Sequence, residues 1–353
     1  MLRSFVLPTL AITMGDPGGI GPEVIVKALA DPALRARARF LLLGLGTSLT
    51  RAAAEAGIEP YWDAAGPFSR WDPTPGVLLL DDELGPRATP YPPFVPEDSA
   101  LGGKLSLAWV ERAIEMAKPQ GSTPAQVQAI VTAPISKTSW QLAGERKHPG
   151  HTGLLAARFG VTKFAMMFAS PSLNTILVTD HIPIKLIYLA IRPESVRDTI
   201  ELGHSAMQQL GVPKPRIAVC GLNPHAGAGG VLGDEDDRHI RPAIEQAAAR
   251  GIHVEGPFPA DTIFRRALHG PGHTPEFDLV VAMYHDQGLI PVKLLDRDRA
   301  VNVTVGLPTI RTSPDHGTAF DIAGENKADP GSMRAAIELA INMATSSGPS
   351  PRS

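Results

Sequence analysis

The feature that most constrains the fold is the alternation of short apolar runs with helical patterns along the chain. Runs such as RFLLLG (Arg39–Gly44) and RIAVCGL (Arg216–Leu222) are short, and turn residues bound them. Between such runs lie segments with helical periodicity, including Ser106–Lys118, Arg238–Gly251 and Gly331–Ala344. Strands that alternate with helices form βαβ units, in which the strands lie parallel. The sequence therefore predicts an α/β fold with a mostly parallel sheet.

Composition narrows the class of protein and its expected location. The chain has 353 residues, 43% of them apolar and 20% charged, with a net charge of −3. The absence of a basic excess argues against a nucleic-acid partner. The single cysteine, Cys220, excludes an internal disulfide framework and favours a reducing compartment. No apolar run approaches the roughly 20 residues of a membrane span. We therefore expect a cytoplasmic protein without membrane or nucleic-acid partners.

A glycine-rich turn follows the first apolar run, in LAITMGDPGGIGPEV (Leu10–Val24). Such turns can cradle phosphate with backbone N–H groups, but this spacing fits neither the P-loop nor the Rossmann pattern. The other interpretation is a tight turn into a helix, with Pro22 in its first position and Glu23 in its first turn. A second candidate, Gly44-x-Gly46, lacks the third glycine because position 49 is leucine. We therefore expect no Rossmann dinucleotide site.

Three histidines occupy one kind of position in the predicted sheet. His181, His225 and His285 each lie at or just beyond the carboxyl end of a predicted strand. Ligands bind at that edge of open α/β sheets, and three imidazoles with one open position suit zinc or a similar metal. Asp286 could be a further ligand or could orient His285. The alternative is that each histidine is a hydrogen-bonded structural residue.

A second group of residues suits an anionic ligand. HPGHTG offers His151, Thr152 and nearby backbone N–H groups, and Lys293, Asn302 and Arg311 lie nine residues apart around a predicted strand, AVNVTVGL. Lysine, arginine and asparagine donors can form a phosphate or carboxylate pocket. The alternative is that these charges are solvated on the surface.

Long motifs give the chain a family resemblance from about residue 10 to residue 344. The segments GHTG, TDHIP, GLNPHAGAGG, GPFPADT, YHDQGLIPVK and VNVTVGLPTIRTSPDHGTAFDIAG are similar to the 4-hydroxythreonine-4-phosphate dehydrogenase family of pyridoxal phosphate biosynthesis. The resemblance implies an isocitrate/isopropylmalate-dehydrogenase-like fold, with two α/β/α subdomains around a mostly parallel sheet and an active-site cleft between them. It also implies a homodimer, NAD, and one divalent metal ion per subunit, which could be zinc, magnesium or cobalt.

The resemblance also assigns roles to single residues. It implies metal ligands at His181, His225 and His285. It implies substrate contacts at His151, Thr152, Lys293, Asn302 and Arg311. The first turn is similar to the GDGIGPEV start of the isopropylmalate dehydrogenases, and we interpret it as shaping the cleft. DHGTAFDIAGENKADP resembles the loop that holds the adenosine half of their cofactor, with Asp329 in place of asparagine. This loop implies cofactor contacts at His316, Gly317, Asp321 and Gly324. The catalytic base stays open between Asp261 and Asp286.

The implied organisation is a discontinuous cofactor-side subdomain and a second subdomain for metal, substrate and dimerisation. The first comprises residues 1–148 and 300–345, the second residues 149–299, and a disordered tail occupies 346–353.

The implied reaction is the NAD- and metal-dependent oxidation of 4-phosphooxy-L-threonine at C3. The resulting 2-amino-3-oxo-4-(phosphooxy)butanoate would decarboxylate to 3-amino-2-oxopropyl phosphate. Related dehydrogenases that act on threonate or erythronate 4-phosphate, or on aromatic dihydrodiol carboxylates, stay open as alternatives. Two rivals from other classes are an acyltransferase on a related fold and a metal-dependent hydrolase.

Overall fold

The computed structural model describes residues 7–67, 69, 76–84, 91–120, 125–148 and 150–346. The chain divides into two compact units: unit 1 comprises Met1–Gly160 and Pro308–Ser353, and unit 2 comprises Val161–Leu307. The sequence had placed these divisions after residues 148 and 299. Helix α6 (His151–Phe159) thus belongs to unit 1, because it packs against a helix of that unit, α4 (Ala100–Ala117).

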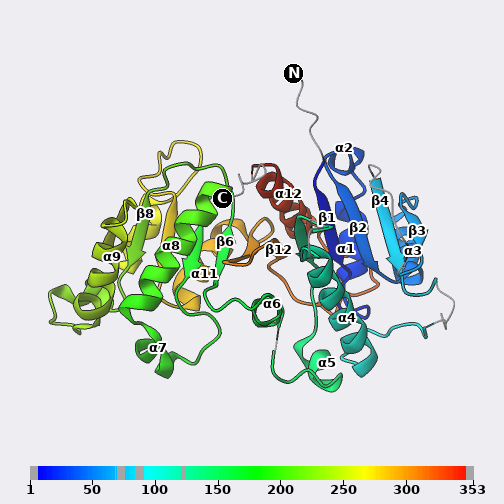
Figure 1. Cartoon of the computed structure of the whole chain (residues 1–353), viewed down its shortest axis with the longest axis horizontal. Helices are drawn as coiled ribbons and strands as arrows, with labels where there is room; N and C mark the ends of the chain where they lie inside the picture. The colour runs from blue at the N-terminus through cyan, green and yellow to red at the C-terminus, as the bar shows by residue number, and fades with distance from the viewer. Residues whose placement is uncertain are drawn as a thin grey trace. The chain divides into compact units, whose positions relative to one another are not determined.

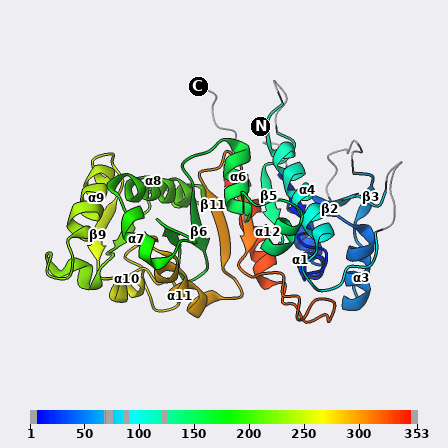
Figure 2. The same cartoon turned by 90° about the horizontal axis from the view of Figure 1, so that it is seen from below.

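Unit 1 is a parallel sheet with helices on both faces. Its strand order is β3-β4-β2-β1-β5-β12, and each neighbouring pair is parallel. In Figure 2, α4 lies above this sheet and α1 and α12 lie below it. The elements of unit 1 that remain to be placed are β1 (Thr9–Thr13), α1 (Gly21–Ala28), α2 (Pro32–Arg35), β2 (Arg39–Gly44), α3 (Gly46–Ala56), β3 (Asp63–Ala65), β4 (Gly76–Asp81), β5 (Ala129–Thr132), α5 (Lys137–Leu142), β12 (Ile310–Pro314) and α12 (Gly331–Ser346).

The central strands of unit 1 are buried along their whole length. All five residues of β1 are buried, and β2 is buried from its second residue onward. Leu10 pairs with Phe40 on one side and with Ala129 on the other. A parallel strand that is covered on both faces has a continuous run of apolar residues in its sequence, rather than an alternation of apolar and polar residues. The apolar runs in the sequence therefore became the centre of this sheet, as Figure 1 shows for β1 and β2.

Unit 2 has a mixed sheet in the order β11-β6-β7-β10-β8-β9. Strands β11, β6 and β7 pair antiparallel, whereas β7, β10, β8 and β9 pair in parallel. Figure 2 shows α8 on one side of the sheet and α10 and α11 on the other. The elements of unit 2 are β6 (Ala165–Ala169), β7 (Thr175–Leu177), α7 (Ile184–Ala190), α8 (Pro193–Gln209), β8 (Ile217–Cys220), the 3-10 turn η1 (Pro224–Ala228), the π-helical turn η2 (Asp236–Ile240), α9 (Arg241–Ala248), β9 (Val254–Phe258), α10 (Ala260–Arg266), β10 (Leu279–Ala282), α11 (His285–Asp296) and β11 (Val301–Val305).

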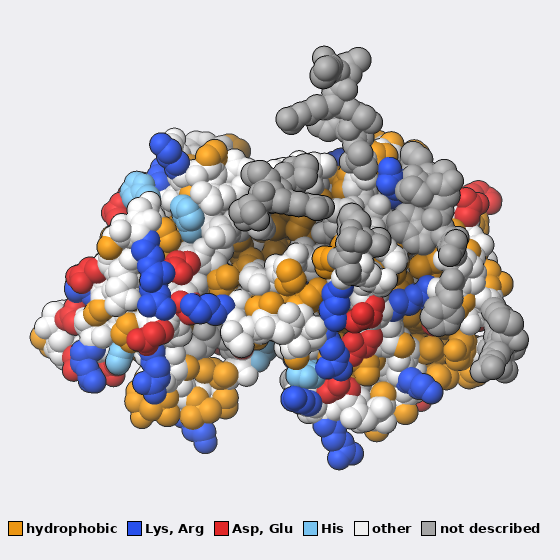
Figure 3. Space-filling view, in the orientation of Figure 1, with side chains coloured by type: hydrophobic (Ala, Val, Ile, Leu, Met, Phe, Trp, Pro, Cys, Tyr) orange, Lys and Arg blue, Asp and Glu red, His pale blue; other side chains and the backbone are white. Residues whose placement is uncertain are grey.

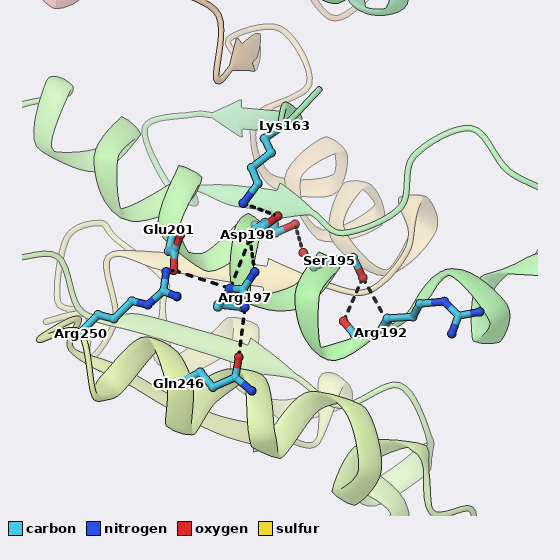
Figure 4. Close-up of polar contacts among 9 residues, drawn as sticks. Lys163, Arg192, Ser195, Arg197, Asp198, Glu201, Gln246 and Arg250 are labelled. Carbon is cyan, nitrogen blue, oxygen red and sulfur yellow. Dashed lines mark hydrogen bonds and ion pairs between the residues drawn. The ribbon is translucent and has the colours of Figure 1, made fainter. Parts of the chain in front are cut away.

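Polar contacts join α8 to its neighbours, as Figure 4 shows. Arg197 donates to Asp198 at 2.8 Å and to the side chain of Gln246 on α9 at 3.2 Å. Lys163 forms a 2.9 Å ion pair with Asp198, and Arg250 pairs with Glu201. Exposed ion pairs contribute about 0.2–1 kcal/mol each, so we interpret this network as fixing the register of α8 rather than as the source of its stability.

The α/β architecture with mostly parallel strands is confirmed, and each predicted apolar run contains a strand. Three strands without an apolar run were not predicted: β3, β9 and β12. The segment of β12, IRTSP, is mostly polar, although four of its five residues are buried. Helix α12 extends through Ser346, the first residue of the expected tail, and residues 347–353 lie outside the described part of the chain. Among the described helices, none has the length and apolar character needed to cross a membrane.

Candidate functional site

Arg311 is a cation buried in the sheet of unit 1. It is the second residue of β12, and parallel pairing with β5 places it opposite Ile130. Thr132 lies two residues further along β5, where its hydroxyl accepts a 2.7 Å hydrogen bond from Nη2 of Arg311. Arg311 is 2% exposed, and this burial lowers the pKa of its guanidinium to about 9. A cation loses several kcal/mol of hydration when it is buried, so such a site favours an anionic partner.

His151 lies beside Arg311, in the first turn of α6. Its ring packs edge-on against Trp140 of α5, with the ring centroids 5.4 Å apart. Its Nε2 atom is buried and has no hydrogen-bond partner among the described residues. Loss of water around the ring lowers its pKa well below the ordinary value of 6.5, and the charge of Arg311 lowers it further. His151 is therefore neutral near physiological pH while no anion is bound.

The pair formed by His151 and Arg311 suits an anion. An anion would compensate for the hydration that Arg311 loses and would accept hydrogen bonds from both side chains. It would also raise the pKa of His151, because it opposes the repulsion from the guanidinium. Thr152, which follows His151 in the same helical turn, adds a hydroxyl nearby. Arg311 is therefore not one of the solvated surface charges that the sequence left open.

In unit 2, the three predicted metal-binding histidines follow adjacent parallel strands. His181 follows β7, His225 follows β8 and His285 follows β10, and β10 lies between the other two strands in the sheet. The hydroxyl of Thr179 donates to the carbonyl of Met283 at 2.7 Å, which joins the ends of β7 and β10.

Gln287 makes the second connection between these strand ends. Its side-chain oxygen accepts from the N–H of Met283 at 2.6 Å, and its side-chain nitrogen donates to the carbonyl of Gly221 at 2.9 Å. This side chain therefore joins the start of α11 to the end of β8. Thr179 thus links the end of β7 to the end of β10, and Gln287 links the end of β10 to the end of β8.

Two of the three imidazoles lie together. The rings of His181 and His285 have centroids 5.2 Å apart and are tilted by 47°. Nδ1 of His285 lies 2.7 Å from Oδ1 of Asp286, which fixes the ring and leaves Nε2 as the nitrogen for a ligand. Within the described residues, no group of three or more His, Cys, Asp or Glu side chains is arranged to hold a metal ion. The imidazole pair fits a borderline divalent metal by its chemistry, and the site of three histidines stays a prediction.

His225 lies in a turn that a buried carboxylate holds. The turn η1 has a left-handed backbone, with φ 53° and ψ 29° at His225, a conformation that is costly for residues other than glycine. Asp236 accepts hydrogen bonds from the N–H groups of Leu222 at 2.8 Å and Asn223 at 3.1 Å. The side-chain amide of Asn223 also donates to Asp236, at 3.0 Å. We interpret Asp236 as the residue that fixes the approach to this turn.

The remaining predicted substrate and base residues lie in unit 2. Lys293 lies on the exposed side of α11. Asn302 lies in β11, and its side-chain oxygen is buried without a hydrogen-bond partner in the described part of the chain. Asp261 is exposed in the first turn of α10, which packs against η1. The structure thus groups His151 with Arg311, while Lys293 and Asn302 belong to the other unit.

The predicted cofactor residues lie in unit 1, on the loop between β12 and α12. Asp321 and Gly324 are exposed, and Gly324 has a left-handed φ of 77°. Nδ1 of His316 lies 3.1 Å from the carbonyl oxygen of Gly317, and its Nε2 is buried without a partner among the described residues. An exposed carboxylate on such a loop is available to ribose hydroxyls.

Sequence reasoning missed four side chains that hold these residues: Thr132, Trp140, Asp236 and Gln287. Thr132 ends a predicted strand and Gln287 lies within the motif YHDQGLIPVK, so a search for polar residues at strand ends would have found both. Trp140 and Asp236 carry no such signal. The hydrogen bond of Asp236 to Asn223 spans 13 residues, across a loop whose path the sequence does not predict.

Comparisons with known proteins give relatives of this chain over nearly its whole length. The family model described as pyridoxal phosphate biosynthetic protein PdxA matches residues 92–340. The D-threonate 4-phosphate dehydrogenase of Cupriavidus necator is 42% identical over 351 residues, which cover 96% of this chain and 98% of that protein. The 4-hydroxythreonine-4-phosphate dehydrogenase of Desulfosudis oleivorans is 42% identical over 350 residues, covering 98% of each chain.

A solved structure extends the comparison to the fold. The crystal structure of the 4-hydroxythreonine-4-phosphate dehydrogenase from Klebsiella pneumoniae matches with a TM-score of 0.79 at 38% sequence identity. The match covers 96% of this chain and 99% of that one.

The neutral state of His151 predicts how stability depends on pH. Below about pH 6.5, the ordinary pKa of histidine, His151 binds a proton in the unfolded chain but not in the folded protein. The free energy of unfolding therefore falls as pH decreases. The slope from this one group is at most about 1.4 kcal/mol per pH unit. We expect His151→Gln to flatten the decline in urea midpoint between about pH 7 and pH 5, whereas the exposed His273→Gln leaves it unchanged. Equal slopes for the wild type and His151→Gln would contradict a neutral, buried His151.

Proposed function

The chain belongs to the family of the pyridoxal phosphate biosynthetic protein PdxA, and we propose that it oxidises 4-phosphooxy-L-threonine with NAD. The family membership that the sequence predicted is thereby confirmed, and the chain is an oxidoreductase of this family. Membership gives no support to the acyltransferase and hydrolase rivals. We place the reaction in the cytoplasm because Cys220 is a free, buried thiol.

The observation that carries the proposal is the buried pair of Arg311 and His151. A phosphate is the group of the substrate that best fits a buried guanidinium beside a neutral imidazole, because it offers oxygen acceptors and up to two negative charges. Thr132 and Trp140 hold the two donors in place, so binding does not require them to be ordered first. Lys293 and Asn302 are the proposed further contacts, from unit 2.

The proposed reaction removes a hydride and a proton from the C3 carbinol. The hydride passes to the nicotinamide ring of NAD, the hydroxyl proton passes to a base, and C3 becomes a ketone. The β-keto acid 2-amino-3-oxo-4-(phosphooxy)butanoate then loses its carboxylate as CO2, and C2 takes up a proton to give 3-amino-2-oxopropyl phosphate. The contact of Asp286 with His285 supports an orienting role for that carboxylate. We therefore propose Asp261, in a helix that packs against the turn of His225, as the base.

The proposed cofactors are NAD and one divalent metal ion, with zinc, magnesium and cobalt all open. Asp321 would accept hydrogen bonds from the ribose hydroxyls and repel the 2′-phosphate of NADP. His316, Gly317 and Gly324 would line the same loop. His181, His225 and His285 would hold the metal, which when bound supplies Lewis acidity toward the substrate hydroxyl.

A second substrate has support from the relatives. The C. necator relative, named for D-threonate 4-phosphate, is as similar to this chain as the D. oleivorans relative, at 42% identity each. Threonate 4-phosphate carries a hydroxyl where 4-phosphooxy-L-threonine carries an amino group, and both carry the phosphate. The pair of Arg311 and His151 would serve either compound. The dihydrodiol carboxylates lack a phosphate and offer the pair only a carboxylate, which carries a single negative charge.

An NADH-formation assay tests the proposal. We expect turnover of 4-phosphooxy-L-threonine with NAD, a lower kcat/KM with NADP, and loss of activity after treatment with a chelator. Arg311→Lys keeps the charge but loses the forked donors, so kcat/KM should fall about 10- to 100-fold, because charge-assisted hydrogen bonds are worth about 1.5–3 kcal/mol each. The surface variant Arg51→Lys is the control and should keep wild-type rates.

Three outcomes of this assay count against parts of the proposal. Equal turnover of the dephosphorylated compound would contradict the phosphate site. A higher kcat/KM for D-threonate 4-phosphate would select that substrate instead. Full activity of the metal-free protein would contradict the proposed metal requirement.

We also propose that the protein is a homodimer, on the basis of exposed apolar side chains in unit 2. Figure 3 shows apolar side chains gathered at the lower left, over α7. Helices α7 and α11 begin near each other, because the rings of His181 and His285 lie 5.2 Å apart. Exposed apolar patches of this kind mark interfaces, and a second copy can bury the same patch symmetrically. The side chains concerned are Ile184, Leu186, Tyr188 and Leu189 of α7, and Ile290, Leu294 and Leu295 of α11.

The dimer proposal predicts the effect of a charge on this surface. Ile184 is 81% exposed and Leu294 is 84% exposed in the single chain, so glutamate at either position costs the monomer little but opposes burial in a dimer. We expect the wild type to sediment as a dimer and Ile184→Glu and Leu294→Glu to sediment as monomers. Leu142→Glu, on α5 of unit 1, is the control and should stay dimeric. A monomeric wild type, or dimers in both variants, would contradict the proposal.

A further inference from the structure

The first glycine-rich turn lies against the start of the loop between β12 and α12, within unit 1. The N–H of Ile20 donates a 2.9 Å hydrogen bond to the carbonyl oxygen of Thr318. A Cβ atom at position 19 would lie 2.9 Å from that oxygen and 3.0 Å from Cβ of Thr318. Position 19 therefore has to be glycine for the loop to approach this closely.

The end of the same loop is held by one lysine of α1. The ammonium group of Lys27 donates to Oε1 of Glu23 at 2.7 Å, to the carbonyl of Asn326 at 3.2 Å and to the carbonyl of Ala328 at 3.0 Å. A lysine ammonium has three N–H donors, so these contacts use all of them.

Glu23 binds both the lysine and the loop. Its Oε1 atom accepts a 2.7 Å hydrogen bond from the N–H of Ala328 as well as the contact from Lys27. The side chains of Glu23 and Lys27 are only 5% and 18% exposed. Little water therefore competes for the pair, unlike an ordinary surface pair one helical turn apart. A third contact comes from α3, where the carbonyl of Glu55 accepts from the side chain of Asn326.

The segment between these anchors carries the proposed cofactor residues. Asp321 and Gly324 lie between Thr318 and Asn326, and both are exposed. Turn hydrogen bonds shape the segment, from the N–H of Ile322 to Ala319 and from the N–H of Glu325 to Ile322. Its position on unit 1 depends on contacts at its two ends, since no strand or helix contains it.

We propose that Glu23 and Lys27 are positioning residues for the cofactor: they hold residues 318–328 in the conformation that presents Asp321 to NAD. This inference rests on the proposed function, because it takes the loop as the NAD site. A loop that is fixed before binding loses no further conformational freedom when the cofactor arrives, which favours affinity. Gly19 contributes to the same positioning, because the absence of a Cβ atom lets the turn lie close to Thr318 of the loop.

Two measurements on the full-length protein test this proposal. Calorimetric titration gives the Kd for NAD, and hydrogen exchange of the free protein reports on residues 319–329, including the N–H of Ala328. We expect Glu23→Gln, Lys27→Met and Gly19→Ala to raise the Kd for NAD by about 10-fold and to speed exchange in this segment. Turnover at saturating NAD and substrate should change much less than the Kd, since neither side chain touches the reacting atoms.

A matched control separates this role from general loss of stability. Asp82 is also a carboxylate of unit 1, and it accepts a 2.8 Å hydrogen bond from the indole N–H of Trp109 and pairs with Arg112 at 3.7 Å, both on α4. Asp82→Ala should lower the thermal midpoint without changing exchange at residues 319–329 or the Kd for NAD. Gly19→Ala leaves both charges in place, so it tests the loop even where a charge variant folds poorly.

The outcomes distinguish the two proposals. Wild-type protein that binds NAD, with variants that bind it equally tightly, would overturn the positioning role alone. Faster exchange without a change in Kd would overturn it as well, because the loop would then not govern affinity. A wild type that binds no NAD would contradict the proposed function, and the positioning role would fall with it.

Discussion

Hydrogen bonding between parallel strands decides where the chemistry of this chain lies. In unit 1, the pairing of β12 with β5 sets Arg311 within reach of the hydroxyl of Thr132. In unit 2, the parallel order β7-β10-β8 brings the ends of three histidine-bearing strands to one edge of the sheet. Side chains such as Gln287 then join the loops that follow those ends. Strand pairing brings the functional residues into the same region, and individual hydrogen bonds then fix the positions of their side chains and loops.

The burial of Arg311 is the basis of the anion site proposed for unit 1. A guanidinium that is 2% exposed has lost most of its hydration, and its lowered pKa reports the same cost. The neutral state of His151 has the same physical origin. Both costs would be offset by a bound anion, so binding free energy is available before any ligand arrives. Under the proposed function, the phosphate of the substrate would be the anion that offsets them.

Sequence reasoning predicted much of the fold because buried parallel strands leave continuous apolar runs. It failed at β12, where Arg311, Thr312 and Ser313 are buried through specific contacts, and polar residues give no strand signal. It identified His181, His225 and His285 as strand-end residues, because each follows an apolar run closely in the sequence. The left-handed backbone at His225 was not predictable, because it depends on a loop closed by Asp236. Donor chemistry grouped His151 with Arg311 in the sequence and the family motifs implied substrate contacts for both, whereas the electrostatics of the pair came from the structure.

We propose that Arg311 and His151 form an anion site whose occupation changes the charge of His151. Calorimetric titration with sulfate, which stays a dianion near neutral pH and stands in for the phosphate, tests this most directly. Titrations in buffers of different ionisation enthalpy measure the protons taken up on binding. We predict that the wild type takes up protons when sulfate binds, and that Arg311→Gln loses most of this affinity. Binding without proton uptake, or equal affinity in Arg311→Gln, would show that the two side chains do not form such a site.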